Sequence, residues 1–192
     1  MPQELEIEFK NMLTKDDFIK LADYFNLKQD DFREQTNYYF DTKDFLLKQL
    51  RAGLRIRKKG SSFECTLKEP FTGIGLMETT DRLTASEADS FLKGEGPLAA
   101  SEVNQRLEAL KINIKDLNNI GTLITKRAEI KYEGGLLVLD HSNYGRTEDY
   151  ELEYEVSNEE KGKATFLEFL ASHSIPIRPA EKKIARLMNA KK

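Results

Sequence analysis

The chain has 192 residues, of which 39% are hydrophobic and 33% charged, and its formal net charge is only −3. This length suits one well-buried domain, so we predict that residues 1–192 form a single domain. Nearly balanced charge and the lack of an apolar run of roughly 20 residues argue against nucleic acid and membranes as partners. One cysteine and a polar, acidic start of the sequence favour a cytoplasmic protein.

The first predicted strand, residues 4–10, alternates charged and apolar side chains without exception. In order, it reads Glu4, Leu5, Glu6, Ile7, Glu8, Phe9, Lys10. Because a strand points successive side chains to opposite faces, one face is ionic and the other apolar. Thr14 then begins a helix that ends near residue 26. Residues 35–41 are predicted as a strand and residues 45–47 as one helical turn.

Residues 53–58 and 63–68 predict a β-hairpin around a glycine and serine turn. Beyond it we predict a strand at 76–83, helices at 84–93 and 102–110, helix or loop at 112–119, strands at 122–132, 136–140 and 151–156, and helices at 159–173 and 179–188. Eight strands in hairpin-like succession with helices between them favour an α+β fold. We expect an eight-stranded antiparallel β-barrel with helices packed outside it.

A second acidic row occupies the last strand. Glu151, Glu153 and Glu155 share one face, opposite Leu152 and Tyr154. Rows of carboxylates repel each other in water, so two of them indicate that a cation belongs nearby. A divalent metal with oxygen ligands is the natural candidate.

The helices have apolar stripes that must cover apolar strand faces, which leaves the ionic faces to line the barrel. An ordinary sheet with its charged face in solvent is the competing interpretation. The predicted interior contains the acids Glu6, Glu8, Glu78, Asp140, Glu153 and Glu155 and the bases Lys10, Arg55, Arg57, Lys68, Arg127 and Lys183. Buried charges need partners, and a metal-bound polyphosphate satisfies both signs, because arginine forks match phosphate oxygens while carboxylates hold Mg²⁺ or Mn²⁺.

The segment from Glu6 to Lys10 resembles the ExExK signature of the CYTH domains, also called triphosphate tunnel metalloenzymes. Further residues follow in the order of that family: Arg55, Arg57, Lys68, Glu78, Arg127, Asp140, Glu153, Glu155 and Lys183. Lys182 competes with Lys183 for the last position, and Glu151 could shift the acidic pair by two residues. Asp140 shares the strand parity of two apolar residues, so we expect a bulge or a strand end to turn it inward.

The resemblance implies a tunnel that binds a triphosphate-containing small molecule and one or two Mg²⁺ or Mn²⁺ ions. It implies metal ligands among Glu6, Glu8, Asp140, Glu153 and Glu155, catalytic roles for Glu6, Glu8, Lys10, Glu153 and Glu155, and substrate binding by Lys10, Arg55, Arg57, Lys68, Glu78, Arg127 and Lys183. The expected enzyme is a metal-dependent hydrolase, first of all a triphosphatase acting on inorganic triphosphate. A thiamine triphosphatase, a class IV adenylate cyclase and a non-catalytic binder of polyphosphate or nucleotides are the alternatives.

Overall fold

A computed structural model describes residues 3–191 of the chain. Its eight strands form a closed antiparallel barrel in the order β1-β5-β4-β3-β2-β6-β7-β8. The predicted fold class is therefore confirmed. No helix in the described part of the chain has the length and apolar character needed to cross a membrane.

The strands are β1 (Gln3–Leu13), β2 (Arg33–Thr42), β3 (Gly53–Lys59), β4 (Ser62–Pro70), β5 (Leu76–Leu83), β6 (Leu117–Tyr132), β7 (Gly135–Asn143) and β8 (Glu148–Val156). The α-helices are α1 (Lys15–Tyr24), α2 (Leu46–Gln49), α3 (Ala85–Leu92), α4 (Ser101–Ala109), α5 (Glu159–Ser172) and α6 (Lys183–Ala190), with 3-10 helices η1 (Gln29–Asp31) and η2 (Ile114–Asp116). Contacts divide the chain into two compact units: one comprises Gln35–Leu123 with the start of β1, the other Glu6–Glu34 and the chain from Ile124 onward.

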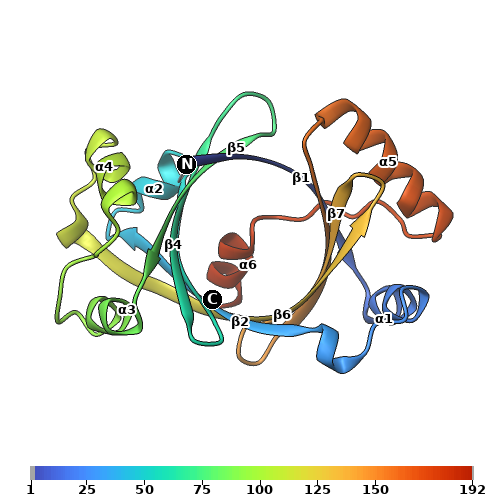
Figure 1. Cartoon of the computed structure of the whole chain (residues 1–192), viewed down its shortest axis with the longest axis horizontal. Helices are drawn as coiled ribbons and strands as arrows, with labels where there is room; N and C mark the ends of the chain where they lie inside the picture. Colours follow the sequence, from blue (N-terminus) through green and yellow to red (C-terminus); the bar gives the residue numbers. More distant parts are fainter. Residues whose placement is uncertain (1–2, 192) are drawn as a thin grey trace. The chain divides into compact units, whose positions relative to one another are not determined.

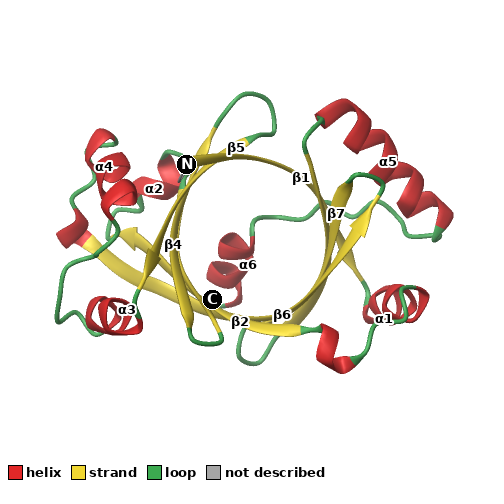
Figure 2. Ribbon diagram, in the orientation of Figure 1, coloured by secondary structure: helices red, strands yellow, loops and turns green. Residues whose placement is uncertain are grey.

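In the first unit, strands β2 to β5 pair with their neighbours in sequence order. Their apolar side chains, including Leu54, Ile56 and Leu67, form one hydrophobic core with Val103 and Leu107 of α4. Figure 2 shows α3 and α4 on the same side of β4. Because alternate residues point the other way, the opposite face of these strands is polar and carries the predicted bases.

In the second unit, β6, β7, β8 and β1 are paired in that order. The apolar side chains of β7 and β8, such as Leu139 and Leu152, pack with Leu21 of α1 and with Phe166 and Phe169 of α5. Helix α6 differs from these two helices, because its lysine and arginine contact the carboxylates on the other face of β8. In Figure 1, α6 is drawn on the opposite side of β7 from α5.

Several strands are longer than the sequence-based prediction, and two further segments differ from it in kind or in where they begin. The segment at residues 112–119, predicted as helix or loop, is the short helix η2 followed directly by β6 at Leu117. The last helix begins at Lys183 and not at residue 179. The backbone of Arg178 explains this delay: its carbonyl accepts from the amide of Met12 at 3.0 Å, and its amide donates to Asn11 Oδ1 at 2.7 Å. These bonds keep the chain extended before α6.

Candidate active site

The charged and apolar residues of β1 separate as the alternation predicts. Phe9 and Leu13 pack with the second hydrophobic core, whereas the Lys10 ammonium lies 2.7 Å from Glu8 Oε1 and 3.6 Å from Glu153 Oε1. Burial by itself would lower the pKa of Lys10, but the charges of Glu153 and Glu8 outweigh it and raise this pKa above its usual value. Lys10 is therefore a permanent cation beside the acidic residues of β1 and β8.

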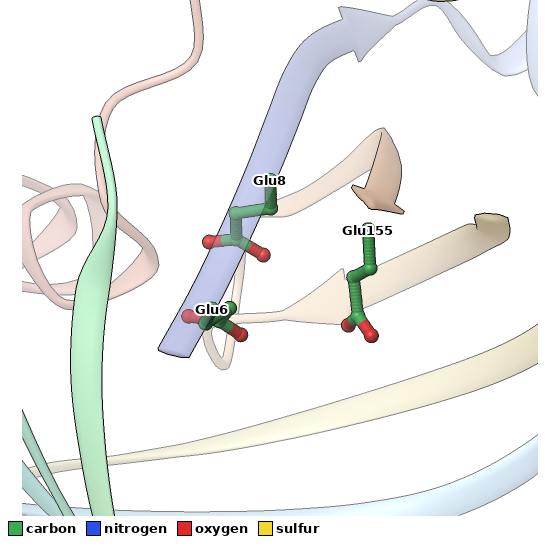
Figure 3. Close-up of side chains that lie close together, drawn as sticks. All are labelled: Glu6, Glu8 and Glu155. Carbon is green, nitrogen blue, oxygen red and sulfur yellow. The ribbon is translucent and has the colours of Figure 1, made fainter. Parts of the chain in front are cut away.

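Three carboxylates of the second unit gather into one group. Glu6 and Glu8 of β1 and Glu155 of β8 each offer an oxygen atom, and these atoms lie within 4.8 Å of one another. Glu8 stands directly opposite Glu155 in the strand register. Figure 3 shows the three side chains turned toward the same space. Carboxylates placed this close repel each other, and they form the hard, oxygen-only donor set that Mg²⁺ and Mn²⁺ accept. The donor set thus fits a divalent metal.

Asp140 and Glu153, which the sequence also offered as metal ligands, are held in an ion-pair network and do not join that group. The guanidinium of Arg127 binds Asp140 with two bonds, from Nε at 2.8 Å and from Nη2 at 2.6 Å, and Nη2 also donates to Glu153 at 2.8 Å. The ammonium of Lys183 lies 2.9 Å from Asp140 Oδ2 and contacts Glu153 as well. Their role as metal ligands stays a prediction.

The oppositely charged groups of this network keep one another ionised. Burial alone would raise the pKa of Glu153, but Lys183 and then Arg127 oppose it and hold the pKa well below the usual range. The pKa of Asp140 is lowered for the same reason, against the effect of complete burial. Burial would lower the pKa of Lys183, yet Asp140 and Glu153 raise it well above its ordinary value. All these groups are therefore charged in the folded protein at neutral pH.

The prediction that a bulge turns Asp140 inward is wrong. The pairing of β7 with β6 and with β8 runs without interruption from Leu136 to Asn143. Strand β7 is buried on both faces: Leu137 and Leu139 face the helices, whereas Val138 shares the ionic side with Asp140. On a strand that is buried on both faces, apolar residues occur on either side, so the apolar neighbours of Asp140 did not indicate which way its side chain points.

The structure distinguishes Lys183 from Lys182 and adds a residue that the sequence analysis missed. Lys182 is the N-cap residue of α6, whereas the Lys183 ammonium reaches the carboxylates of β7 and β8. Arg186 follows one helical turn later. Its Nη2 donates to Glu151, and its Nη1 lies 3.4 Å from Asp149. Two cations three residues apart share a helix face, and this spacing was the available signal.

The predicted bases of the first unit lie on the polar face of β3 and β4. Arg57 Nε donates to Asn37 Oδ1 of β2 at 2.7 Å. Lys68 lies opposite Glu78 of β5, and the two side chains form an ion pair at 2.5 Å. The Nε of Arg55 is buried and makes no hydrogen bond within the described part of the chain. Such an orphaned cationic donor suits an anionic ligand.

A closed antiparallel barrel that carries a group of three glutamates and a set of bases on its polar strand faces is the arrangement expected of a CYTH domain. The sequence profile of the CYTH domain matches residues 4–188, and the chain belongs to this family.

Among known proteins, the chain is 44% identical to the "Putative triphosphatase YjbK" of Bacillus subtilis (strain 168), over 100% of this chain and 98% of that protein. A crystal structure of a "putative adenylate cyclase" from Bacillus halodurans has a TM-score of 0.92 and 44% identity, and the match covers 97% of this chain and 98% of the other. A structure of HpAC1 from Hippeastrum, with a TM-score of 0.79, 21% identity and coverage of 98% and 96%, shares the fold.

Proposed function

We propose that the protein is a metal-dependent triphosphatase that hydrolyses a phosphoanhydride bond, with inorganic triphosphate as its first substrate. The observation that carries this proposal is the group of Glu6, Glu8 and Glu155, whose donor atoms lie within 4.8 Å of one another. An anion-binding protein needs only bases, whereas three converging carboxylates suit a bound divalent metal. The similarity to a Bacillus subtilis protein named as a triphosphatase supports the same activity.

In this proposal Glu6, Glu8 and Glu155 would hold Mg²⁺ or Mn²⁺. When bound, such an ion polarises phosphate oxygens and lowers the pKa of a coordinated water. Lys10, which pairs with Glu8, would contact a phosphate oxygen beside the carboxylates. Glu153 keeps the ammonium of Lys183 and the guanidinium of Arg127 in place. Fixed charges of this kind stabilise negative charge that grows in the transition state without reorganising during the reaction.

The bases of the first unit would bind phosphate oxygens. Arg55 and Arg57 offer planar forks that match phosphate geometry, and Lys68 adds a compact charge steadied by Glu78. The proposal thus assigns phosphate binding to the bases and metal binding to Glu6, Glu8 and Glu155. That the chain works as a single domain in the cytoplasm, without nucleic acid as partner, stays a prediction from the sequence.

An adenylate cyclase is the second candidate, because a protein of that designation from Bacillus halodurans is 44% identical to this chain. Both reactions begin with attack on a phosphorus atom of a bound triphosphate, so the same metal and bases would serve either. HpAC1, a cyclase by name with dominant triphosphatase activity, has the same fold. The products separate the two reactions, since hydrolysis splits inorganic triphosphate with water into phosphate and pyrophosphate, whereas a cyclase converts ATP into cyclic AMP and pyrophosphate without releasing phosphate.

A product assay tests the proposal. The protein, freed of metal by a chelator, is given inorganic triphosphate, thiamine triphosphate or ATP, each with Mg²⁺, with Mn²⁺ or with neither. We expect phosphate release from inorganic triphosphate, only with metal, and faster than from the other two. Pyrophosphate and cyclic AMP from ATP would identify a cyclase, preference for thiamine triphosphate a thiamine triphosphatase, and binding without turnover a polyphosphate sensor.

Arg55→Ala tests the phosphate-binding role, with Arg82→Ala as the matched control. Arg82 lies on β5 of the same unit and is exposed. Because Arg55 would stabilise charge on the transferred phosphoryl group, we expect kcat/KM to fall by about 100-fold in the first variant and to stay near the parent value in the second. Equal activity of the two variants would contradict the assignment of Arg55.

A further inference from the structure

Asn37 lies on β2 directly opposite Arg57 of β3, on the polar face of the first unit. Its Oδ1 accepts the hydrogen bond from Arg57 Nε at 2.7 Å. Asn37 is 1% exposed and Arg57 is 8% exposed, so this bond is shielded from solvent. An arginine can only donate, and of the two atoms at the end of an asparagine side chain only the oxygen can accept. The bond therefore fixes which atom of Asn37 is the amide nitrogen.

The amide nitrogen of Asn37 has no hydrogen-bond partner in the described part of the chain, although it is buried. Buried polar groups are nearly always paired, because an unpaired donor loses its bonds to water without replacement. The amide cannot rotate to solve this problem, since the oxygen would then leave Arg57. The two N–H bonds of Nδ2 are thus directed at something that the polypeptide does not supply.

A second unpaired donor belongs to the same polar face. Arg55 is two residues from Arg57 on β3, and it stands opposite Tyr39, which is two residues from Asn37 on β2. Its Nε is buried and has no partner either. Two neighbouring strands therefore present orphaned N–H donors on one face. Their chemical complement is a group that only accepts, and a fully ionised phosphate oxygen is such a group.

We propose that Asn37 is a phosphate-binding residue, which donates from Nδ2 to a phosphate oxygen of the substrate while its Oδ1 orients the guanidinium of Arg57. This inference rests on the proposed function and extends it to a neutral residue. A neutral N–H donor fixes the direction of a hydrogen bond without adding charge to the site. It therefore favours an acceptor oxygen at one position, whereas the arginines attract negative charge from any direction.

Two substitutions separate the two halves of the proposal. Asn37→Asp keeps an oxygen for Arg57 but removes the donor, and Asn37→Ala removes both. The probe is inorganic triphosphate, titrated calorimetrically into the full-length protein in the presence of a chelator so that no metal contributes. We expect the dissociation constant to rise about 10-fold to 100-fold in both variants. Asn104→Ala is the control, because Asn104 of α4 donates to Leu98 O at 2.7 Å and belongs to the helical side of the unit.

A spectroscopic measurement reports on the amide itself. In a ¹⁵N correlation spectrum, the side-chain NH₂ signal of Asn37 is identified by its absence from Asn37→Asp. Triphosphate should move one of its two proton signals downfield, as expected for a new hydrogen bond to an anion, and should leave the Asn104 signal in place. A residue that only positions Arg57 would lose affinity on substitution without this shift.

Each outcome has a definite meaning. If Asn37→Asp binds triphosphate as the parent does, or if the Asn37 amide signal does not move at saturation, Asn37 is not a ligand. If only Asn37→Asp is weakened and Asn37→Ala is not, the effect is charge repulsion and the inference fails. If the parent protein itself does not bind triphosphate in the presence of the chelator, the bases and Asn37 form no phosphate site of their own and the inference fails. Failure of the proposed function is seen in a different measurement, because the parent protein then releases no phosphate from triphosphate when Mg²⁺ or Mn²⁺ is supplied.

Discussion

Two acidic groups on the ionic side of the second unit have nearly the same composition and quite different surroundings. The first comprises Glu6, Glu8 and Glu155, and the second comprises Asp140, Glu151 and Glu153. Each contains two carboxylates that face each other across paired strands, Glu8 with Glu155 and Asp140 with Glu151. In the second group, Lys183 lies within 3.0 Å of both facing carboxylates. In the first, the three side chains offer oxygen atoms that lie within 4.8 Å of one another, and Glu8 pairs with Lys10 at 2.7 Å.

The comparison teaches that neighbours, and not residue type, assign a role to a carboxylate. Asp140 and Glu151 are 0% exposed, and a charge so deeply buried persists only with partners of opposite charge. The carboxylates of the first group are partly exposed, so solvent weakens their mutual repulsion and a divalent cation can reach them. We therefore expect the second group to support folding and the first to support metal binding.

The largest expected effect comes from Glu153→Gln in the second group. The substitution keeps the shape but removes the charge that Lys183 and Arg127 share. Two buried cations would then have only the remaining carboxylates, so we expect the free energy of unfolding to fall by about 3 kcal/mol. Urea denaturation followed by circular dichroism measures this. Glu129→Gln, at an exposed position of β6, should change it by less than about 0.5 kcal/mol.

A smaller effect on stability, and a large one on metal binding, is expected from Glu8→Gln in the first group. The change relieves repulsion from Glu155 and loses an ion pair with Lys10 that is partly open to solvent. Without metal, the free energy of unfolding should therefore stay within about 1 kcal/mol of the parent value.

With Mn²⁺, the melting temperature of the parent protein should rise, because an ion that binds only the folded state stabilises it. The rise should be largely lost in Glu8→Gln and retained in Glu129→Gln. The reverse pattern would contradict the roles assigned to the two groups: Glu153→Gln would lose the Mn²⁺-induced rise in melting temperature and keep the free energy of unfolding of the parent.

A modest loss of stability, with no effect on metal binding, is expected from Asp17→Asn, which serves as a reference outside both groups. Asp17 accepts from the amide of Thr14 at the start of α1 and pairs with Arg178 at 2.8 Å. The Arg178 side chain is 34% exposed, so solvent weakens the pair, and we expect a loss of about 1 kcal/mol at about pH 7.

This loss should depend on pH in a definite direction. Burial would raise the pKa of Asp17, but the bonds from Thr14 and Arg178 lower it below the usual value. A carboxyl with a lowered pKa stabilises the fold above its unfolded pKa of about 4 and stops doing so as the pH falls through the folded pKa. The stability difference between parent and Asp17→Asn should thus be constant from about pH 5 to 8 and shrink below about pH 4 in urea titrations. A constant difference down to acid pH would contradict this.

The sequence by itself determined the fold class and the side of each strand on which the charges lie. Strict alternation in residues 4–10 and 151–156 is a local property, because neighbouring side chains of any strand point to opposite faces. The apolar stripes of the helices then decided which face they cover. The order of charged residues along the chain was enough to indicate the CYTH family, and the family match over residues 4–188 confirms it.

Only the tertiary structure decided which charges meet. Strand register and the docking of α6 bring Lys183 to Asp140 and Glu153, and strand register places Asn37 against Arg57. Residues far apart in the chain make these contacts, so no local pattern encodes them. Asn37 and Asp140 illustrate the physical reason: a neutral amide and a carboxylate acquire their roles from the partner that burial leaves them, and that partner is set by the fold as a whole.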